Sequence, residues 1–183
     1  MDEADAVILE DYGKGLMTQE VIDAVCDAAL KKGIPVGLDP KEGHHLRLRN
    51  LTVVTPNRKE AFQAAGVKET PAEGDPLKDE SLLRVVDQLR LEWGSELLLI
   101  TLGAQGMLLV EQVGDPVHIP TLAREVFDVS GAGDTVIGVF TACLAGGASA
   151  QEAACLANAA AGVVVSKLGT ATVTCEEILG VFS

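Results

Sequence analysis

A glycine turn followed by an acidic residue is the part of this sequence best suited to chemistry. Residues 126–140 read V-F-D-V-S-G-A-G-D-T-V-I-G-V-F, so Gly131, Ala132 and Gly133 precede Asp134 on the first turn of an apolar helix. The amides of such a turn point into one concavity beside the positive end of the helix dipole, which suits a phosphate. Asp134 could then take a proton from a hydroxyl while the amides stabilise the phosphoryl group transferred to it. Alternatively, Asp134 only complements the dipole, worth about 0.3 to 1 kcal/mol.

A second candidate site is the N-x-x-E segment at 57–60. Asn57 and Glu60 are spaced i, i+3 and lie on one face of a predicted short helix. That spacing suits a hydrated Mg²⁺ held through water and nucleotide phosphates. A helix-capping Asn with a surface Glu explains the pattern equally well. Arg58 and Lys59, between them, are either cofactor-binding or solvated side chains.

Further glycines and a lysine stand at predicted strand ends. Thr101, Gly103 and Gly106 form a turn where a backbone can approach a ligand, although a hairpin turn also accounts for the glycines. Lys14 is flanked by two glycines, but no G-x-x-x-x-G-K-[ST] is present, so this segment is not a P-loop. Lys14 remains a candidate contact for the phosphate of a sugar phosphate.

Strand and helix patterns alternate along the first two thirds of the chain, which predicts an α/β layered fold with a mainly parallel sheet. Apolar runs predict strands at 6–9, 35–39, 51–55 and 97–101, and antiparallel partners at 107–110 and 117–119. Periodic patterns predict helices at 18–32, 57–65, 81–93, 132–145, 150–167 and 174–179, with a surface loop at 68–78. Ligands in such sheets bind outside the carboxyl ends of the strands, where the polar clusters 11–14, 39–41, 57–60, 103–106 and 130–134 fall.

The same residues carry a family resemblance. D-x-S-G-A-G-D-T at 128–135 resembles the C-terminal signature of the ribokinase-like (PfkB) carbohydrate kinases. E-D-Y-G-K-G-L at 10–16, T-P-N-R-K-E at 55–60 and A-N-A-A-A-G-V-V-V-S-K-L-G-T-A-T-V at 157–173 resemble one branch, the kinase domain of ADP-heptose synthesis enzymes. The resemblance implies a three-layer ribokinase-like fold in which 1–183 is the C-terminal part, and ATP-dependent phosphorylation of heptose 7-phosphate at its anomeric hydroxyl.

The resemblance also assigns site residues. It implies that Asp134 is the general base behind its glycine turn, and it favours ATP and Mg²⁺ at the N-x-x-E segment. It places nucleotide phosphate and ribose near the 101–106 turn and adenine near Asn158 and Gly162, although close helix packing explains those two residues equally well. Asp128 and Ser130, with the loop 167–173, resemble a monovalent-cation site for K⁺ built mainly of backbone carbonyls.

Composition limits the partners. A length of 183 residues with 48% hydrophobic residues predicts one domain with an ample core. The net charge of -13 works against nucleic acid or an anionic membrane as a partner. The acidic N-terminus lacks the order of a signal peptide, so we expect a cytoplasmic location. The four cysteines lack a C-x-x-C pair and are expected to be unpaired thiols, and His44, His45 and His118 are expected at the surface.

The resemblance also implies that part of the kinase domain lies outside this chain. The family has its sugar-binding residues and lid largely in the preceding half, so we expect the N-terminal part of the domain to be missing. We therefore expect weak ATP binding and poor turnover by this chain alone. The exposed sheet edge should favour a homo-oligomer or association with the missing half. Two alternatives stay open: a non-catalytic nucleotide-binding or oligomerisation module, and a kinase with another acceptor such as fructose phosphate, ribose or a nucleoside.

Overall fold

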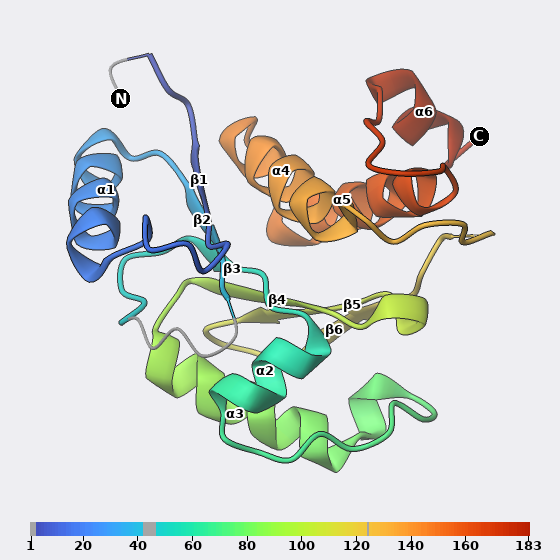
Figure 1. The fold of residues 1–183 in the computed structure, drawn as a ribbon, viewed down its shortest axis with the longest axis horizontal. Helices are drawn as coiled ribbons and strands as arrows, with labels where there is room; N and C mark the ends of the chain where they lie inside the picture. Colours follow the sequence, from blue (N-terminus) through green and yellow to red (C-terminus); the bar gives the residue numbers. More distant parts are fainter. Residues whose placement is uncertain (1–2, 42–46, 124) are drawn as a thin grey trace.

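A six-stranded sheet separates two layers of helices in the described part of the chain (Figure 1). The structure is a computed structural model that describes residues 3–41, 47–123 and 125–183. The strands follow chain order across the sheet: β1 (Val7–Glu10), β2 (Val36–Asp39), β3 (Val53–Val54), β4 (Leu97–Thr101), β5 (Met107–Glu111) and β6 (Val117–Ile119). β1 to β4 are parallel, and β5 and β6 run antiparallel to their neighbours. The predicted α/β class and mainly parallel sheet are confirmed.

The helices cover both faces of this sheet (Figure 1). One face packs against α1 (Gln19–Lys32), α2 (Arg58–Ala64) and α3 (Glu80–Trp93), and the other against α4 (Ala132–Ala145) and α5 (Ala150–Val165). The short helix α6 (Cys175–Gly180) packs on α5. Side chains alternate along a strand, so Val54 joins the core beneath α2 and α3 while Val53 joins the core beneath α4 and α5.

Strand β1 is the exception to two-sided burial. Its composition is apolar, yet it pairs only with β2 among the described strands, and Ile8 is 38% exposed. The central strands β2 and β4 are buried along almost their whole length. β1 therefore has the sequence of an inner strand and the position of an edge strand.

The predicted elements are confirmed with small differences at their ends. β3 is shorter than the predicted 51–55, although the amides of Thr52 and Thr55 still donate to carbonyls of β2. α5 ends at Val165, before the predicted Lys167, because the amides of Ser166 and Lys167 donate to carbonyls three residues earlier and tighten the last turn.

Close contact between α4 and β2 depends on Gly37. A Cβ atom at this position would lie 2.6 Å from the hydroxyl of Thr141 and 3.1 Å from Ile137, both on α4. The hydroxyl of Thr141 is buried and has no hydrogen-bond partner among the described residues. Only glycine lets α4 approach the sheet this closely.

The remaining predictions concern isolated residues. His44 and His45 lie outside the described residues. His118 is partly buried and not on the open surface, because its Nε2 lies 2.7 Å from the carbonyl oxygen of Gln105. All four cysteines are free thiols, of which Cys26 is buried and Cys175 exposed. Across the described residues, every helix is too short or too polar to span a bilayer.

Candidate active site

The first turn of α4 is exposed and lacks a side-chain cap. The other five α-helices of the described chain each begin with a side-chain oxygen that accepts an amide hydrogen, from Thr18, Asn57, Asp79, Ser149 and Thr174. The cap residue before α4 is Gly131, whose φ of 79° is strained for any residue with a side chain. Within the described residues, the amides of Gly133 and Asp134 have no acceptor. Free donors and the positive end of a helix dipole therefore coincide beside an exposed carboxylate.

The turn before α4 is held against the loop that follows α5. Asp128 accepts hydrogen bonds from the amides of Ser130 at 2.9 Å and Gly169 at 3.1 Å. The bonds from Ser130 and then Gly169 hold the pKa of Asp128 below its ordinary value. A Cβ atom on Gly131 would lie 3.2 Å from the methyl group of Thr170. The two segments predicted to share a monovalent-cation site thus lie side by side, with the Asp128 carboxylate occupied by backbone amides.

Acidic side chains gather where the parallel strands end. Glu10 ends β1, Asp39 ends β2, and Glu60 and Asp134 face them from the first turns of α2 and α4. Burial, followed by the negative charge of Glu60, raises the pKa of Asp39 to about 7, although a hydrogen bond from the Thr55 hydroxyl opposes the shift. The charges of Asp134 and Glu10 add to the effect.

Two of these residues were not selected from the sequence. Asp39 was noted only as part of a polar cluster after a strand, and Glu10 only within a matched segment. The signal that finds them is position, because both end parallel strands on the edge where ligands bind. In the described part of the chain, no group of three or more His, Cys, Asp or Glu side chains is arranged to hold a metal ion by itself.

Asn57 and Glu60 form a reciprocal capping box. Asn57 Oδ1 accepts from the amide of Glu60 at 2.9 Å, and Glu60 Oε2 accepts from the amide of Asn57 at 2.8 Å. The capping interpretation is therefore present, and the second carboxylate oxygen of Glu60 remains for other contacts. Thr101 lies beside Asn57 through an isolated parallel bridge, in which its amide donates to the carbonyl of Pro56 at 3.0 Å. The structure thus brings the N-x-x-E segment and the 101–106 turn together.

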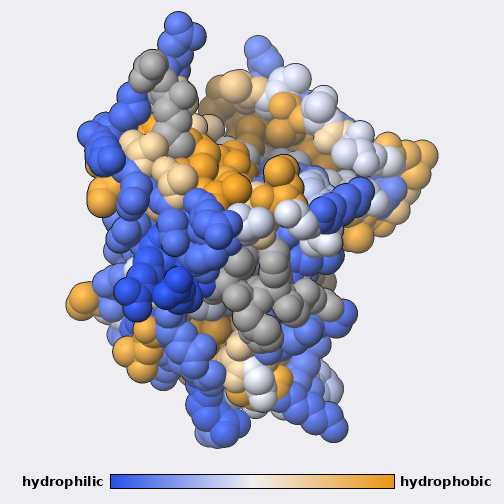
Figure 2. Space-filling view, turned by 60° about the vertical axis from the view of Figure 1, so that its left-hand side comes forward, coloured by the Kyte–Doolittle hydropathy of each residue, from blue (hydrophilic) through white to orange (hydrophobic). Residues whose placement is uncertain are grey.

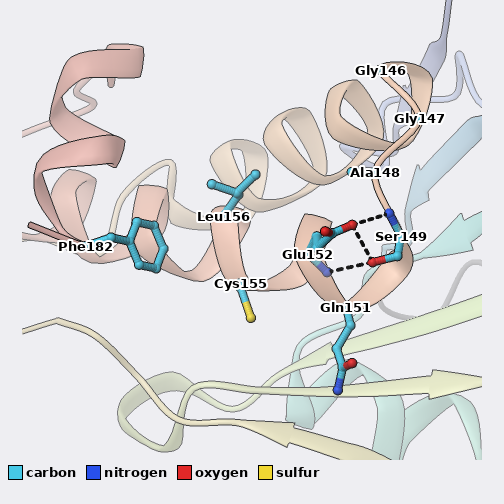
Figure 3. A pocket seen from close by; sticks show the side chains of 9 residues that line it. All are labelled: Gly146, Gly147, Ala148, Ser149, Gln151, Glu152, Cys155, Leu156 and Phe182. Carbon is cyan, nitrogen blue, oxygen red and sulfur yellow. Dashed lines mark hydrogen bonds between the residues drawn. The ribbon is translucent and has the colours of Figure 1, made fainter.

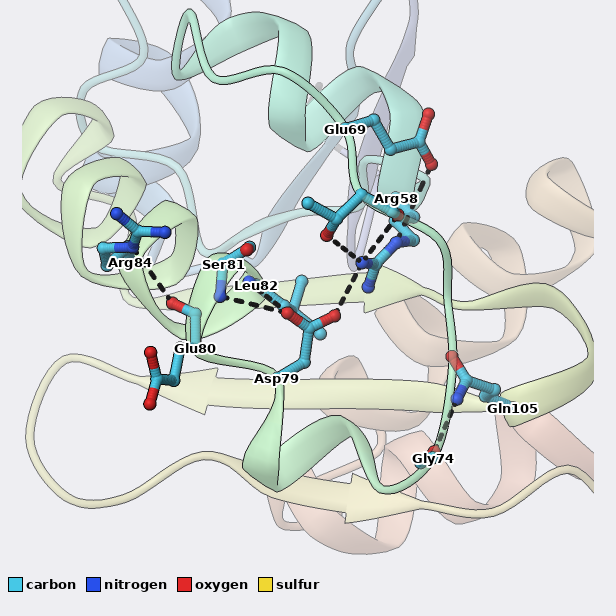
Figure 4. A network of polar contacts seen from close by, with 10 residues as sticks. Arg58, Glu69, Gly74, Asp79, Glu80, Ser81, Leu82, Arg84 and Gln105 are labelled. Atoms are coloured by element: carbon cyan, nitrogen blue, oxygen red, sulfur yellow. Dashed lines mark hydrogen bonds and ion pairs between the residues drawn. The ribbon is translucent and has the colours of Figure 1, made fainter.

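Arg58 does not lie in this site. Its side chain is buried and pairs with Asp79 at 2.6 Å (Figure 4). It also donates to the carbonyl of Thr70, and its Cζ lies 4.7 Å from the centroid of the Phe62 ring. Asp79 also caps α3 by accepting from two amides of its first turn. The expectation that Arg58 binds the cofactor or is solvated does not fit this geometry, because the guanidinium ties α2 to the loop before α3. Phe62 follows Arg58 by four residues on α2, so helical spacing accounts for that contact, whereas Asp79 lies 21 residues away.

The turn after β4 contains one ligand-accessible glycine and one packing glycine. Gly103 is exposed with a φ of 58°. Gly106 is buried against the end of β6, where a Cβ atom would collide with the carbonyl oxygen of Ile119. Packing explains Gly106, whereas the approach of a ligand to Gly103 stays a prediction. Gln105, between them, donates to the carbonyl of Gly74 at 2.8 Å and fixes the loop before α3 (Figure 4).

Asn158 and Gly162 pack α5 against the segment after β6. Asn158 is 3% exposed, and its Nδ2 donates to the carbonyl of Pro120 at 2.6 Å. A Cβ atom on Gly162 would lie 3.2 Å from the amide nitrogen of Ala123. The close-packing alternative accounts for both residues. Lys14 and Lys59, by contrast, are exposed at the strand-end side of the molecule.

A separate pocket lies at the other end of α4 (Figure 3). Its lining comes from Gly146, Gly147, Ala148, Ser149, Gln151, Glu152, Cys155, Leu156 and Phe182. None of the predicted site residues lines it. α4 has 14 residues, so about 21 Å separates the two ends of the helix. Ser149 and Glu152 are moreover occupied with each other at the start of α5, so this pocket is not the site described above.

Comparisons with known proteins identify the family of this chain. The family model described as pfkB family carbohydrate kinase matches residues 2–177. Bifunctional protein HldE of Trichlorobacter lovleyi is 46% identical over 180 residues, which cover 98% of this chain and 35% of that protein. The chain therefore spans about a third of the length of the curated relatives it matches.

Solved structures agree on the fold. Ribokinase of Arabidopsis thaliana, complexed with ribose and ATP, matches with a TM-score of 0.80 and 26% identity, covering 97% of this chain and 55% of that chain. Phosphofructokinase-2 of Escherichia coli, in complex with potassium, matches with a TM-score of 0.77 over 97% of this chain and 56% of that chain. At 19% identity this second likeness shows the fold alone. The chain belongs to the pfkB family of carbohydrate kinases and has a ribokinase-like fold.

Proposed function

We propose that this chain is the nucleotide-binding and catalytic-base part, 1–183, of a kinase that transfers phosphate from ATP to a sugar hydroxyl in the cytoplasm. The observation that carries the proposal is the uncapped first turn of α4, with free amides at Gly133 and Asp134 beside the Asp134 carboxylate. Membership of the carbohydrate kinase family supports the reaction class. The ribokinase that was solved with ATP supports the nucleotide.

Heptose 7-phosphate is the proposed acceptor, phosphorylated at its anomeric hydroxyl for ADP-heptose synthesis. The support is the 46% identity to HldE proteins over nearly the whole chain, together with the E-D-Y-G-K-G-L and T-P-N-R-K-E segments. Lys14, exposed in the first of these segments, is the proposed contact for the sugar's own phosphate. Another acceptor, such as a fructose phosphate, ribose or a nucleoside, is the alternative that substrate assays separate.

In the proposed reaction, the carboxylate of Asp134 accepts the proton of the acceptor's hydroxyl. The amides of Gly133 and Asp134, with the dipole of α4, stabilise the phosphoryl group as its charge spreads over three oxygens. Positioned amides contribute much of the rate enhancement, because catalysis of phosphoryl transfer depends mainly on positioning and electrostatic stabilisation. Thr101 and the exposed Gly103 are the proposed contacts for the nucleotide, on the turn beside Asn57.

The acidic strand ends fit a divalent cation. Burial, followed by the negative charge of Glu60, raises the pKa of Asp39, and a bound cation would favour its ionised form. Asn57, Glu60 and Asp39 would hold Mg²⁺ through water and nucleotide phosphates, because no described cluster forms a complete cage. When bound, Mg²⁺ neutralises charge on the phosphates. For K⁺, the proposal is the adjacent carbonyls of segments 128–130 and 167–170, which Asp128 holds together.

Calorimetry and a coupled kinase assay test this proposal. We expect ATP with Mg²⁺ to bind this chain weakly, and heptose 7-phosphate to be phosphorylated poorly unless the rest of the kinase domain is supplied. Asp134→Asn should lower turnover by about 10² to 10⁴-fold while leaving ATP affinity unchanged. Absence of any ATP binding would contradict the proposal. Binding without turnover, even in the presence of the remaining domain, would favour the non-catalytic module.

We further propose that the free edge of β1 pairs with the part of the domain that lies outside this chain. The matched ribokinase chain has almost half of its length beyond the region covered here. β1 has the composition of an inner strand, its outer edge is unpaired among the described residues, and Ile8 is exposed. Figure 2 shows apolar side chains gathered on this side of the molecule, bordered by hydrophilic ones. Light scattering with and without the N-terminal part of the domain tests this pairing. A stable monomer that does not bind the N-terminal part would contradict it. A homodimer would instead indicate that the edge of β1 pairs with a second copy of this chain.

A further inference from the structure

Tyr12 joins the end of β1 to the first turn of α4. Its hydroxyl lies 3.0 Å from Glu10 Oε2 and 3.1 Å from Asp134 Oδ2, so one phenol bridges a carboxylate near it in sequence and a second one far along the chain. A phenol has a single proton, and at any moment it donates to only one of them. The loop that carries Tyr12 is itself fixed, because Asp11 accepts from the amide of Gly13 at 2.8 Å.

We propose that Tyr12 is a positioning residue for Asp134, an inference that rests on the proposed function. The carboxylate of Asp134 is exposed, and Tyr12 supplies its one hydrogen bond among the described residues, at Oδ2. Oδ1 is left for the acceptor's hydroxyl. A free aspartate side chain exchanges between rotamers and loses conformational entropy when the acceptor binds. A carboxylate that is already held in one orientation avoids this entropy cost. The bridge therefore prepares the carboxylate at the strand-end site.

Tyr12 acts in this bridge as a donor and not as a base. The hydrogen bonds to Glu10 and Asp134, followed by the negative charges of the same two groups, raise the pKa of Tyr12 to about 12. The nearby carboxylates of Asp39 on β2 and Glu60 on α2 also add negative charge to this edge of the sheet. The phenol consequently stays protonated throughout the neutral range.

The chain offers a clean spectroscopic test because it contains one tyrosine. With a pKa of about 12, about 3% of Tyr12 is ionised at pH 10.5, against about three quarters for an ordinary tyrosine. Tyrosinate absorbance at pH 10.5 should therefore be small in the wild type and rise several-fold in Asp134→Asn and in Glu10→Gln. Asp87→Asn is the matched control, since it removes one charge from an exposed position on α3 and should change nothing. Circular dichroism at the same pH confirms that each variant is folded.

A second measurement, at neutral pH, tests the bridge even if the protein unfolds at pH 10.5. With ¹³C-labelled tyrosine, the single Cζ signal should shift in Asp134→Asn and stay in place in Asp87→Asn. An ordinary ionisation near pH 10 in the folded wild type, or an unchanged signal in Asp134→Asn, would overturn the bridge. Neither readout requires kinase activity. A wild type that transfers no phosphoryl group even with the remaining part of the kinase domain present would therefore refute the proposed function and still leave the bridge tested.

The positioning role has its own readout. Tyr12→Phe removes only the hydroxyl and should lower kcat about tenfold while leaving the dissociation constant for ATP unchanged. The assay is run with the remaining part of the kinase domain present. A Tyr12→Phe variant with wild-type kcat, in a protein whose tyrosine titration confirms the bridge, would overturn the positioning role.

Discussion

Replacing Asp39 by asparagine should stabilise the protein clearly more at pH 8 than at pH 5. The asparagine side chain has the same shape, and its amide oxygen can still accept the 3.1 Å hydrogen bond from the Thr55 hydroxyl. The substitution removes only the negative charge, which burial disfavours most and which the charges of Glu60, Asp134 and Glu10 also disfavour. The effect should therefore grow as the pH rises from about 4 to 7, where the unfolded chain has lost the Asp39 proton and the folded protein still holds it.

The magnitude follows from the pKa of Asp39. It is about 7 in the folded protein and 3.8 as the ordinary value, a difference of about 3 units. Because the folded state holds the proton more tightly, the free energy of unfolding falls as the pH rises from about 4 to 7, and stays lower above 7. At about 1.4 kcal/mol per unit, the cost of ionised Asp39 is at most about 4 kcal/mol. Partial exposure to solvent reduces this, so we expect Asp39→Asn to raise the free energy of unfolding at pH 8 by about 2 to 4 kcal/mol.

Urea denaturation at pH 5 and pH 8 measures the effect, with Asp87→Asn as a control for the loss of an exposed charge. Mg²⁺ should raise the wild-type midpoint at pH 8 and raise that of Asp39→Asn less, because the variant has lost a proposed metal contact. Equal stabilisation at both pH values would refute the electrostatic reasoning. Destabilisation at pH 8 would show that Asp39 is instead paired with a cation in solution.

Two substitutions elsewhere test how the site is held. Arg58→Ala should destabilise the protein by about 3 kcal/mol, because it leaves the Asp79 carboxylate without its partner at 2.6 Å. The control Arg84→Ala, on the exposed face of α3, should change stability little. Equal effects of the two substitutions in thermal denaturation would contradict a stabilising role of the Arg58–Asp79 ion pair. Gly37→Ala should cost about 1 to 3 kcal/mol, because its Cβ would meet the Thr141 hydroxyl at 2.6 Å, and restoration of the melting temperature by Thr141→Ala is the expected rescue. Failure of that rescue would place the strain elsewhere.

Much of the fold was predictable from local chemistry. Gly33 ends α1 in the left-handed conformation, and Thr174 with Glu177 forms the capping box expected from the pattern T-x-x-E. Parallel strands carry continuous apolar runs because both their faces are covered, so β2 and β4 were readable as inner strands. β1 has the same kind of sequence, which is why its position at the edge of the described sheet could not be read from its residues.

The functional roles of the site residues stay predictions, and the structure shows where each side chain lies. The glycine turn correctly predicted that Asp134 lies in the first turn of α4. Arg58 was misassigned, since its partner Asp79 lies 21 residues away and no local period links them. Tyr12 was missed as a site residue because its contact with Asp134 spans 122 residues and depends on how α4 packs against β1. Long-range polar contacts of this kind are set by packing and not by spacing.

The most direct test of the central claim is the response of the backbone amides to nucleotide. In ¹⁵N-labelled protein titrated with ATP and Mg²⁺, the amide signals of Gly133 and Asp134 should move most, because these donors have no acceptor among the described residues. Amides at the far end of α4, from Gly146 to Ser149, should stay in place. Movement confined to that far end, or unmoved signals at Gly133 and Asp134 at saturating nucleotide, would contradict the claim that the first turn of α4 binds the phosphate.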